Sequence, residues 1–217
     1  MKAIEEIKAQ IEAAVSGVQI ELVLNPSPAA QHSLVVDHAH AVAVATYLRD
    51  AADLQFDLCS NASGVDWLDR EVSEKVKTKK IVDGAEQEVE ETVKKTVPGF
   101  LESVYHLYST VLGHGPLVLR LRTADRGDNV EVPSLTPVWR SCEFQEREIF
   151  DLYGIVFTGH PDLRRLLMWD EFKDHPMRRD YVEPDDYEYE PTAHDQVLQR
   201  AEEHRAQLRA AQERTAE

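Results

Sequence analysis

The sequence predicts an α+β domain followed by an extended C-terminal tail. In three segments apolar residues recur at intervals of three and four, which is typical of amphipathic helices, and five other segments have the composition of strands. After Phe157 the apolar residues lose any sustained period. We therefore expect a core domain over residues 1–157 and a tail over residues 158–217 that lies on another surface.

The N-terminal segment predicts a helix and a pair of strands. The helix is expected from Lys2 to Ser16, and Gly17 is placed to end it in a left-handed conformation. Strands are expected over Val18 to Leu24 and over Ser33 to Val36, with turn residues at Asn25 to Pro28 between them.

A second helix and three more strands are predicted next. Asp37 can cap this helix, which is expected to extend to about Ala52. The predicted order is therefore helix, two strands, helix, three strands. The last three strands are expected over Gln55 to Cys59, Ser103 to Ser109 and Leu117 to Thr123.

A charged segment, Arg70 to Pro98, interrupts these last strands. It carries seven acidic and seven basic residues with few apolar ones, so it has little to bury. Asp83-Gly84 is a typical two-residue hairpin turn. We interpret the segment as an inserted hairpin or loop that projects from the core.

The third helix is predicted to follow Val132-Pro133-Ser134 and to end at Tyr153, before Gly154. Glu146 falls within the apolar stripe of this helix, so we expect it to be covered. Because a covered carboxylate needs a partner, we expect an arginine beside it. Farther on, the tail is expected to contain a polar helix over Ala193 to Ala216.

Charged and apolar groups of the third helix and the tail predict contacts with a partner. Arg147 lies four residues after Glu143 and four before Asp151, so its guanidinium can bridge two helix turns. In the tail, two pairs of arginines flank a group of large apolar residues. Pro161 and Pro176 stiffen the turns that present the arginines, which lowers the ordering cost of docking.

Composition excludes several classes of function. The formal net charge of −16 disfavours binding to nucleic acid, because a phosphate backbone requires a basic face. Cys59 and Cys142 lie far apart without C-x-x-C spacing, so thiolates cannot build an iron–sulfur or zinc site. The longest run without charged residues, Ser103 to Leu119, is too polar to span a bilayer, and Met1 to Val15 does not resemble a secretory signal. We expect a cytoplasmic chain with protein partners.

The sequence predicts no catalytic, cofactor-binding or metal-binding residue. Nucleotide-binding glycine motifs and the G-x-S-x-G elbow do not occur. The pairs His38-x-His40 and His160-x-Asp162, with His175, are scattered fragments of a metal-ligand set. A soluble metal-dependent hydrolase is therefore a remote alternative, and a free-standing interaction module is another.

One long stretch carries a resemblance to a known family. Glu146 to Phe157 (EREIFDLYGIVF), with its continuation over Thr158 to Met168 and His175 to Tyr181, resembles the signature of the thirty-kilodalton (C-type) subunit of respiratory complex I. Looser matches lie upstream, as at Val65-Asp66, whereas Ser141 to Gln145 departs from the usual family pattern.

This resemblance implies a two-layer domain with a mixed five-stranded sheet, and a tail that wraps the quinone-reducing (forty-nine-kilodalton, D-type) subunit beside neighbouring iron–sulfur subunits. It also implies that the chain itself binds no cofactor, although the complex uses FMN, iron–sulfur clusters, NADH and quinone. The chain would be a cofactor-free structural subunit of the peripheral arm, on the cytoplasmic side of the cell membrane, touching the membrane only through the complex. The nearest alternative is the equivalent subunit of a membrane-bound nickel–iron hydrogenase-type complex.

The expected partner contacts combine the family motif with the basic and apolar groups of the tail. They are Glu146, Arg147, Asp151, His160, Pro161, Asp162, Arg164, Arg165, Leu166, Leu167, Trp169, Phe172, His175, Pro176, Arg178, Arg179, Asp180 and Tyr181.

Overall fold

The structure, a computed structural model, describes residues 2–29, 31–82 and 85–182, with the backbone alone over 74–82 and 85–93. Residues Met1 to Tyr181 form one compact unit. This unit therefore includes the first part of the segment expected to be a tail. The polar helix predicted over Ala193 to Ala216 lies outside the described residues.

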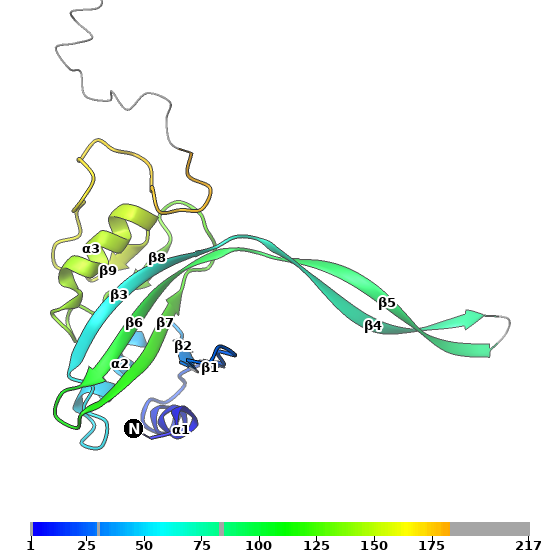
Figure 1. Cartoon of the computed structure of the whole chain (residues 1–217), viewed down its shortest axis with the longest axis horizontal. Helices are drawn as coiled ribbons and strands as arrows, with labels where there is room; N and C mark the ends of the chain where they lie inside the picture. Colours follow the sequence, from blue (N-terminus) through cyan, green and yellow to red (C-terminus); the bar gives the residue numbers. More distant parts are fainter. Residues whose placement is uncertain (1, 30, 83–84, 183–217) are drawn as a thin grey trace, which may run out of the picture. The chain divides into compact units, whose positions relative to one another are not determined.

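A mixed five-stranded sheet forms the centre of this unit (Figure 1). The strand order is β1-β2-β7-β6-β3, in which only β2 and β7 run parallel and the other neighbours are antiparallel. The predicted α+β class with a mixed sheet is confirmed. The strands are β1 (Ile20–Val23), β2 (Ser33–Val36), β3 (Leu58–Trp67), β6 (Phe100–Ser109) and β7 (His114–Arg122).

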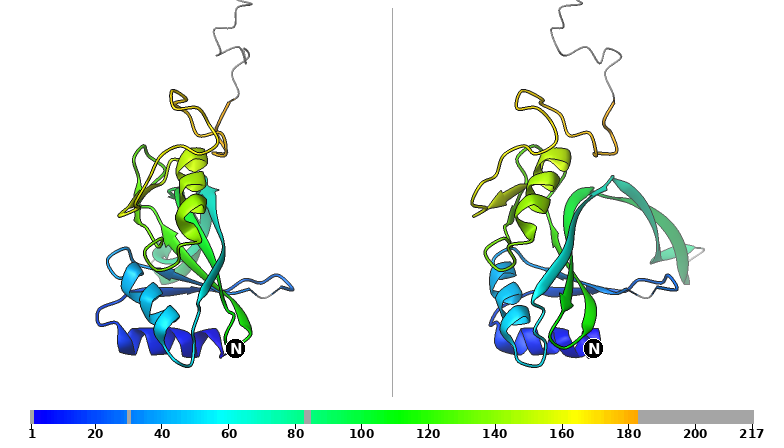
Figure 2. Two further views of the ribbon diagram at one scale, coloured as in Figure 1. Left: turned by 90° about the vertical axis from the view of Figure 1, so that its left-hand side faces the viewer. Right: turned by 60° about the vertical axis from the view of Figure 1, so that its left-hand side comes forward.

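Three helices supply the second layer: α1 (Ile4–Ala14), α2 (Ala41–Asp50) and α3 (Cys142–Tyr153). Their buried apolar residues join one core cluster with alternate residues of β6 and β7, such as Leu107 and Leu119. Figure 2 shows α2 and α3 on the same side of β3 and β6. Burial of one sheet face against these helices provides the main hydrophobic stabilisation.

Two predicted helix starts are wrong. Asp37 does not cap α2, because its carboxylate accepts a hydrogen bond from the Gln19 N–H (2.8 Å) and contacts the His40 ring (2.6 Å). The third helix begins at Cys142 and not directly after Ser134. The intervening residues form turns, since Pro137 disfavours helical geometry in the residue before it.

The strand predicted over Gln55 to Cys59 lies farther along the chain, at Leu58–Trp67. Gln55 has a φ of 42°, and the N–H of Phe56 bonds back to the carbonyl oxygen of Leu48 at the end of α2. These residues therefore turn the chain out of the helix before β3 begins. The predicted end of the third helix is correct, because Gly154 adopts a left-handed φ of 78°.

Between β3 and β6 the chain forms a long antiparallel hairpin of β4 (Arg70–Val82) and β5 (Ala85–Val97). Its register pairs Arg70 with Val97 at one end and Val82 with Ala85 at the other. The predicted turn residues Asp83-Gly84 lie outside the described residues. A second small pair, β8 (Glu131–Pro133) and β9 (Val156–Thr158), is parallel and flanks α3 in the sequence.

Candidate partner interface

Asp151, in the last turn of α3, fixes the chain that follows the helix. One carboxylate oxygen accepts the backbone N–H groups of residues 166–168 at 2.7 to 3.0 Å, and the other accepts a hydrogen bond from Arg165 at 2.7 Å. Burial alone would raise the pKa of Asp151, but these hydrogen bonds outweigh it and lower the pKa below its ordinary value. Asp151 therefore stays ionised and holds residues 165–168 against α3.

Glu146, one turn earlier, is fully buried, as predicted. Its carboxylate accepts hydrogen bonds from the hydroxyls of Tyr105, Ser134 and Thr136 and from the N–H of Leu135, at 2.5 to 3.0 Å. The predicted arginine partner is wrong, since no arginine among the described residues pairs with Glu146. Burial raises the pKa of Glu146, because the cost of removing the carboxylate from water outweighs the hydrogen bonds that favour its ionised form.

Arg147 is buried and turns toward the segment after β9. Its guanidinium donates to the carbonyl oxygens of residues 164–165 at 3.1 to 3.2 Å, and it lies 3.8 Å from the carboxylate of Asp162. Within the described residues Arg147 does not bridge Glu143 and Asp151 as predicted, because the carboxylate of Asp151 accepts its hydrogen bonds from other donors. Arg147 thus holds the backbone of its own chain.

The segment from His175 to Tyr181 closes around the C-terminal end of α3. Arg178, largely buried, donates to the carbonyl oxygens of Tyr153 (2.7 Å) and of residues 126–127 (3.2 Å). The His175 ring contacts the carbonyl oxygen of Asp151 at 3.0 Å. A Cβ atom on Gly154 would lie 2.5 Å from the His175 ring, so the helix stop requires glycine for space as well as for its φ.

An ion pair that the sequence did not reveal joins this segment to the sheet. Arg126 binds both carboxylate oxygens of Asp66 on β3, at 2.6 and 2.8 Å, and also pairs with Asp180 at 2.9 Å. The N–H of Arg179 donates to Asp66 at 2.8 Å. Burial would raise the pKa of Asp66, but the bonds from Arg126 and Arg179 lower it. These carboxylates therefore fasten residues 179–180 beside β3.

Four further predicted contact residues lie in turns, two of them directly after β9 and two in the segment from His175 to Tyr181. The His160 ring contacts the carbonyl oxygen of Glu143 at 2.9 Å, and Pro161 beside it is exposed. Pro176 is half-buried, and the N–H of Tyr181 donates to the carbonyl oxygen of Arg178 at 3.1 Å. Each of these turns is closed within the chain.

The predicted contact residues thus divide into an inward and an outward set. Arg165 and Arg178 are turned inward onto α3, whereas Arg179 is exposed. The side chain of Arg164 is 69% exposed, and among the described residues it pairs only with Asp162. The exposed apolar side chains are Leu166, Leu167 and Trp169, and the ring of Trp169 packs against that of Phe172 at 4.7 Å. We call the exposed side chains of residues 164, 166, 167, 169 and 179 the outward set.

Comparison with known proteins decides the family. The family model described as "Respiratory-chain NADH dehydrogenase, 30 Kd subunit" matches residues 34–187. The chain belongs to this family. It is thus a subunit of the NADH:quinone oxidoreductase complex of the respiratory chain, as the resemblance predicted.

Two relatives in sequence agree with this assignment. The chain is 37% identical over 182 residues to the C-type NADH-quinone oxidoreductase subunit of Coxiella burnetii (strain Dugway 5J108-111), covering 82% of this chain and 74% of the relative. It is 48% identical over 77 residues to the C/D-type NADH-quinone oxidoreductase subunit of Bacteroides fragilis (strain ATCC 25285), covering 36% and 14%. A solved trypsin-resistant fragment of Nqo5 is similar at 22% identity and a TM-score of 0.43, covering 74% of this chain and 98% of that one.

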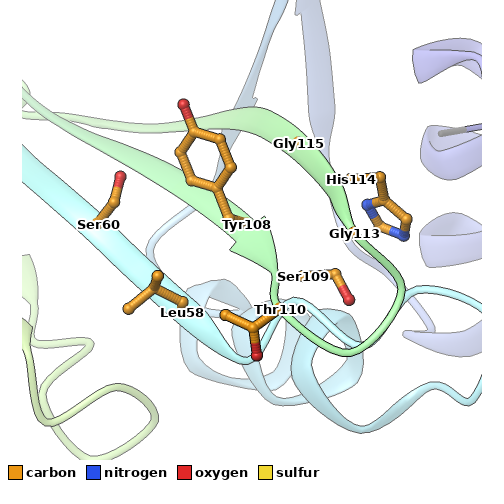
Figure 3. Close-up of a pocket in the computed structure, with 8 residues that line it drawn as sticks. All are labelled: Leu58, Ser60, Tyr108, Ser109, Thr110, Gly113, His114 and Gly115. Carbon is orange, nitrogen blue, oxygen red and sulfur yellow. The ribbon is translucent and has the colours of Figure 1, made fainter.

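One hollow of the chain lies away from the contacts described above. It has a volume of about 560 Å³ and sits where β6 turns into β7, next to the start of β3 (Figure 3). None of the predicted contact residues lines it. Separately, no helix among the described residues is long and apolar enough to cross a membrane.

Sequence reasoning missed the groups that complete these contacts. Asp66 stands out in the sequence only within a looser family match and Ser134 only ahead of the third helix, and no pattern singles out Arg126 or Thr136. Their roles arise from pairings such as Asp66 with Arg126, which lie 60 residues apart. A buried acid in a strand, as in Val65-Asp66-Trp67, was the one available signal that a cation had to be near.

Proposed function

We propose that this chain is a structural subunit that joins the quinone-reducing module by direct contact with the D-type subunit. The observation that carries the proposal is the outward set on a segment that Asp151 holds rigidly against α3. A segment ordered in advance loses less conformational entropy on docking, and exposed large apolar residues are favoured as interface anchors.

The fused C/D relative supports the choice of partner. In that protein the two subunit types are parts of one chain, which fits subunits that lie side by side in the complex. In this proposal residues 1–157 are the scaffold and residues 158–217 carry the partner contact, with neighbouring iron–sulfur subunits also in reach. The chain would then sit on the cytoplasmic side of the membrane and touch it only through the complex.

A surface substitution tests the partner contact. Leu167→Glu is expected to reduce the amount of the chain recovered in the purified complex at least about tenfold, because it places a charge in an apolar interface. Leu167 is 59% exposed, so the isolated variant should unfold at the wild-type temperature. Co-purification with the D-type subunit, followed by quantitative mass spectrometry, measures the effect.

Leu24→Glu is the matched control. Leu24 is 63% exposed and lies just after β1, outside residues 158–182, so its substitution should leave assembly unchanged. Normal assembly of Leu167→Glu, or equal loss for both variants, would contradict the proposed interface.

We also infer that the chain binds none of the redox groups of the complex. Two acids of α3 already have partners within the chain, since Asp151 pairs with Arg165 and Glu146 accepts hydrogen bonds from neutral donors. We expect the purified full-length chain to be colourless, without absorbance in the flavin or iron–sulfur bands. Ultraviolet–visible spectra and metal analysis measure this, and a chromophore stoichiometric with protein would refute it.

A further inference from the structure

The outer edge of β3 has no role in the proposed function. β3 is the last strand of the sheet, so one side of it has no neighbouring strand. Along a strand, the backbone groups of successive residues point alternately to either side. The Ala62 N–H points outward, because it donates to the side chain of Gln145 on α3. The N–H and C=O groups of Gly64 and Asp66 therefore point outward as well.

The pairing with β6 supports this direction. Leu101 lies opposite Asp66, and its own N–H and C=O groups bond to Thr123 on the other side, at 2.9 Å each. Leu101 therefore makes no backbone bond to Asp66, as expected for a pair whose groups point away from each other. Val65 and Ser63, in contrast, direct their backbone groups toward β6.

Residues at the start of α3 form hydrogen bonds with the outward backbone groups of only the first part of β3. The carbonyl oxygen of Cys59 accepts a hydrogen bond from Ser141 at 2.8 Å, and Gln145 takes the Ala62 N–H. Beyond Ala62, no described residue bonds to the outward backbone groups of Gly64 or Asp66. A short stretch of edge is thus left open, and β3 contains neither the lysine nor the proline that commonly block such edges.

The open stretch lies in a groove whose lining is polar and apolar in similar measure. Two hollows of about 270 and 230 Å³ run along it and share Gly64, Tyr153 and Met177. A Cβ atom on Gly64 would overlap the Tyr153 ring, so this ring lies directly over the strand. Met177 is 53% exposed and offers a second apolar surface. Side chains of an added strand would find apolar contacts here.

The charges of the groove indicate what kind of segment fits. Glu148 of α3 lines the first hollow and is exposed, and it makes no ion pair among the described residues. Arg179 lines the second hollow. A segment with Lys or Arg beside Glu148 and a neutral or acidic residue toward Arg179 would complement both charges.

We propose that an extended segment of another subunit of the complex adds to β3 as a further strand, bonding to the backbone of Gly64 and Asp66 and placing a basic residue beside Glu148. Strand addition of this kind takes its affinity from main-chain hydrogen bonds and its specificity from alternate side chains. This assignment rests on the proposed function, since it requires that the chain be assembled with other subunits.

Amide hydrogen exchange resolved to single residues tests the proposal, on the isolated full-length chain at two concentrations and on the purified complex. The N–H groups of Gly64 and Asp66 are expected to exchange at least about tenfold more slowly in the complex. Those of Ser63 and Val65, bonded to β6, are internal controls that are slow in both samples. Glu148→Lys should reduce the new protection in the complex.

The alternatives give distinct results. Rapid exchange of Gly64 and Asp66 in an assembled complex would overturn the strand addition alone, whereas absence of the chain from the complex would overturn the proposed function together with it. Protection already present in the isolated chain would assign the edge to its own C-terminal residues, or to a second copy if it grows with concentration, and either result overturns the partner assignment. Glu131→Lys, at an exposed glutamate on β8, is the charge control. If protection of Gly64 and Asp66 falls equally in both lysine variants, or in neither, the partner segment does not place a basic residue beside Glu148.

Discussion

Glu146→Ala is expected to lower the free energy of unfolding by about 4 kcal/mol, since each buried donor left without an acceptor costs about 1 to 3 kcal/mol. Four donors lose their acceptor, namely the Leu135 N–H and the hydroxyls of Tyr105, Ser134 and Thr136. The hydroxyls can rotate to other acceptors, so the cost should fall below the full sum. Urea unfolding followed by circular dichroism measures the loss.

Glu146→Gln separates hydrogen bonding from charge. The amide oxygen can still accept from Leu135 and Tyr105, while the amide group can donate to the hydroxyl oxygens of Ser134 and Thr136 once these rotate. We therefore expect a loss of only about 1 kcal/mol. Equal losses in the alanine and glutamine variants would contradict this account of the site.

The pH dependence gives a second check on Glu146. Its pKa is raised in the folded state, so protonation favours folding. The stability linked to this group is fully present below the unfolded pKa and is lost as pH rises through the folded pKa. Glu146→Gln should lack that loss, so the wild type should lose stability relative to the variant as pH rises above about 4, the unfolded pKa of a glutamate. A constant difference across this window would count against a raised pKa.

Periodicity in the sequence was enough to predict the class of fold and the burial of Glu146. The spacing of apolar residues locates the three helices, and the position of Glu146 within a stripe of them requires that it be covered. Its partners were not predictable in the same way. They depend on the turn over residues 134–136, which brings three donors together in a conformation that spacing does not specify.

Contacts between distant segments explain the other errors. Local spacing placed Arg147 between Glu143 and Asp151, but backbone carbonyl groups of residues 164–165 bind its guanidinium instead. The four arginines of the tail look equivalent in sequence, yet Arg165 and Arg178 are held by groups of α3. Which arginine faces outward is decided by tertiary packing, and charge pattern carries no information about it.

Asp151→Ala is expected to release residues 165–168 from α3 and to lower the free energy of unfolding by about 3 kcal/mol, because removing one partner of a buried ion pair leaves the other uncompensated. Arg165 and the three N–H groups of residues 166–168 would lose their shared acceptor. Trypsin should then cleave after Arg164 or Arg165 much faster than in the wild type, since the freed segment can enter the protease. Asp170→Ala, at an exposed aspartate of the same segment, is the control and should change neither stability nor cleavage appreciably.

The pH dependence at Asp151 has the opposite sign to that at Glu146. Its pKa is lowered in the folded state, so its contribution is present above the unfolded pKa of about 3.9 and is lost as pH falls through the folded pKa. The stability gap between the wild type and Asp151→Asn should therefore shrink below about pH 4, while the gap for Glu146→Gln moves the other way as pH rises. The contrast follows from the balance between burial and hydrogen bonds. At Asp151 the bonds from three N–H groups and Arg165 outweigh burial, whereas at Glu146 burial outweighs the four hydrogen bonds. A gap for Asp151→Asn that stays constant or widens in acid would show that the ionised carboxylate is not what holds residues 165–168 in place, and would remove the rigid platform on which the outward set depends.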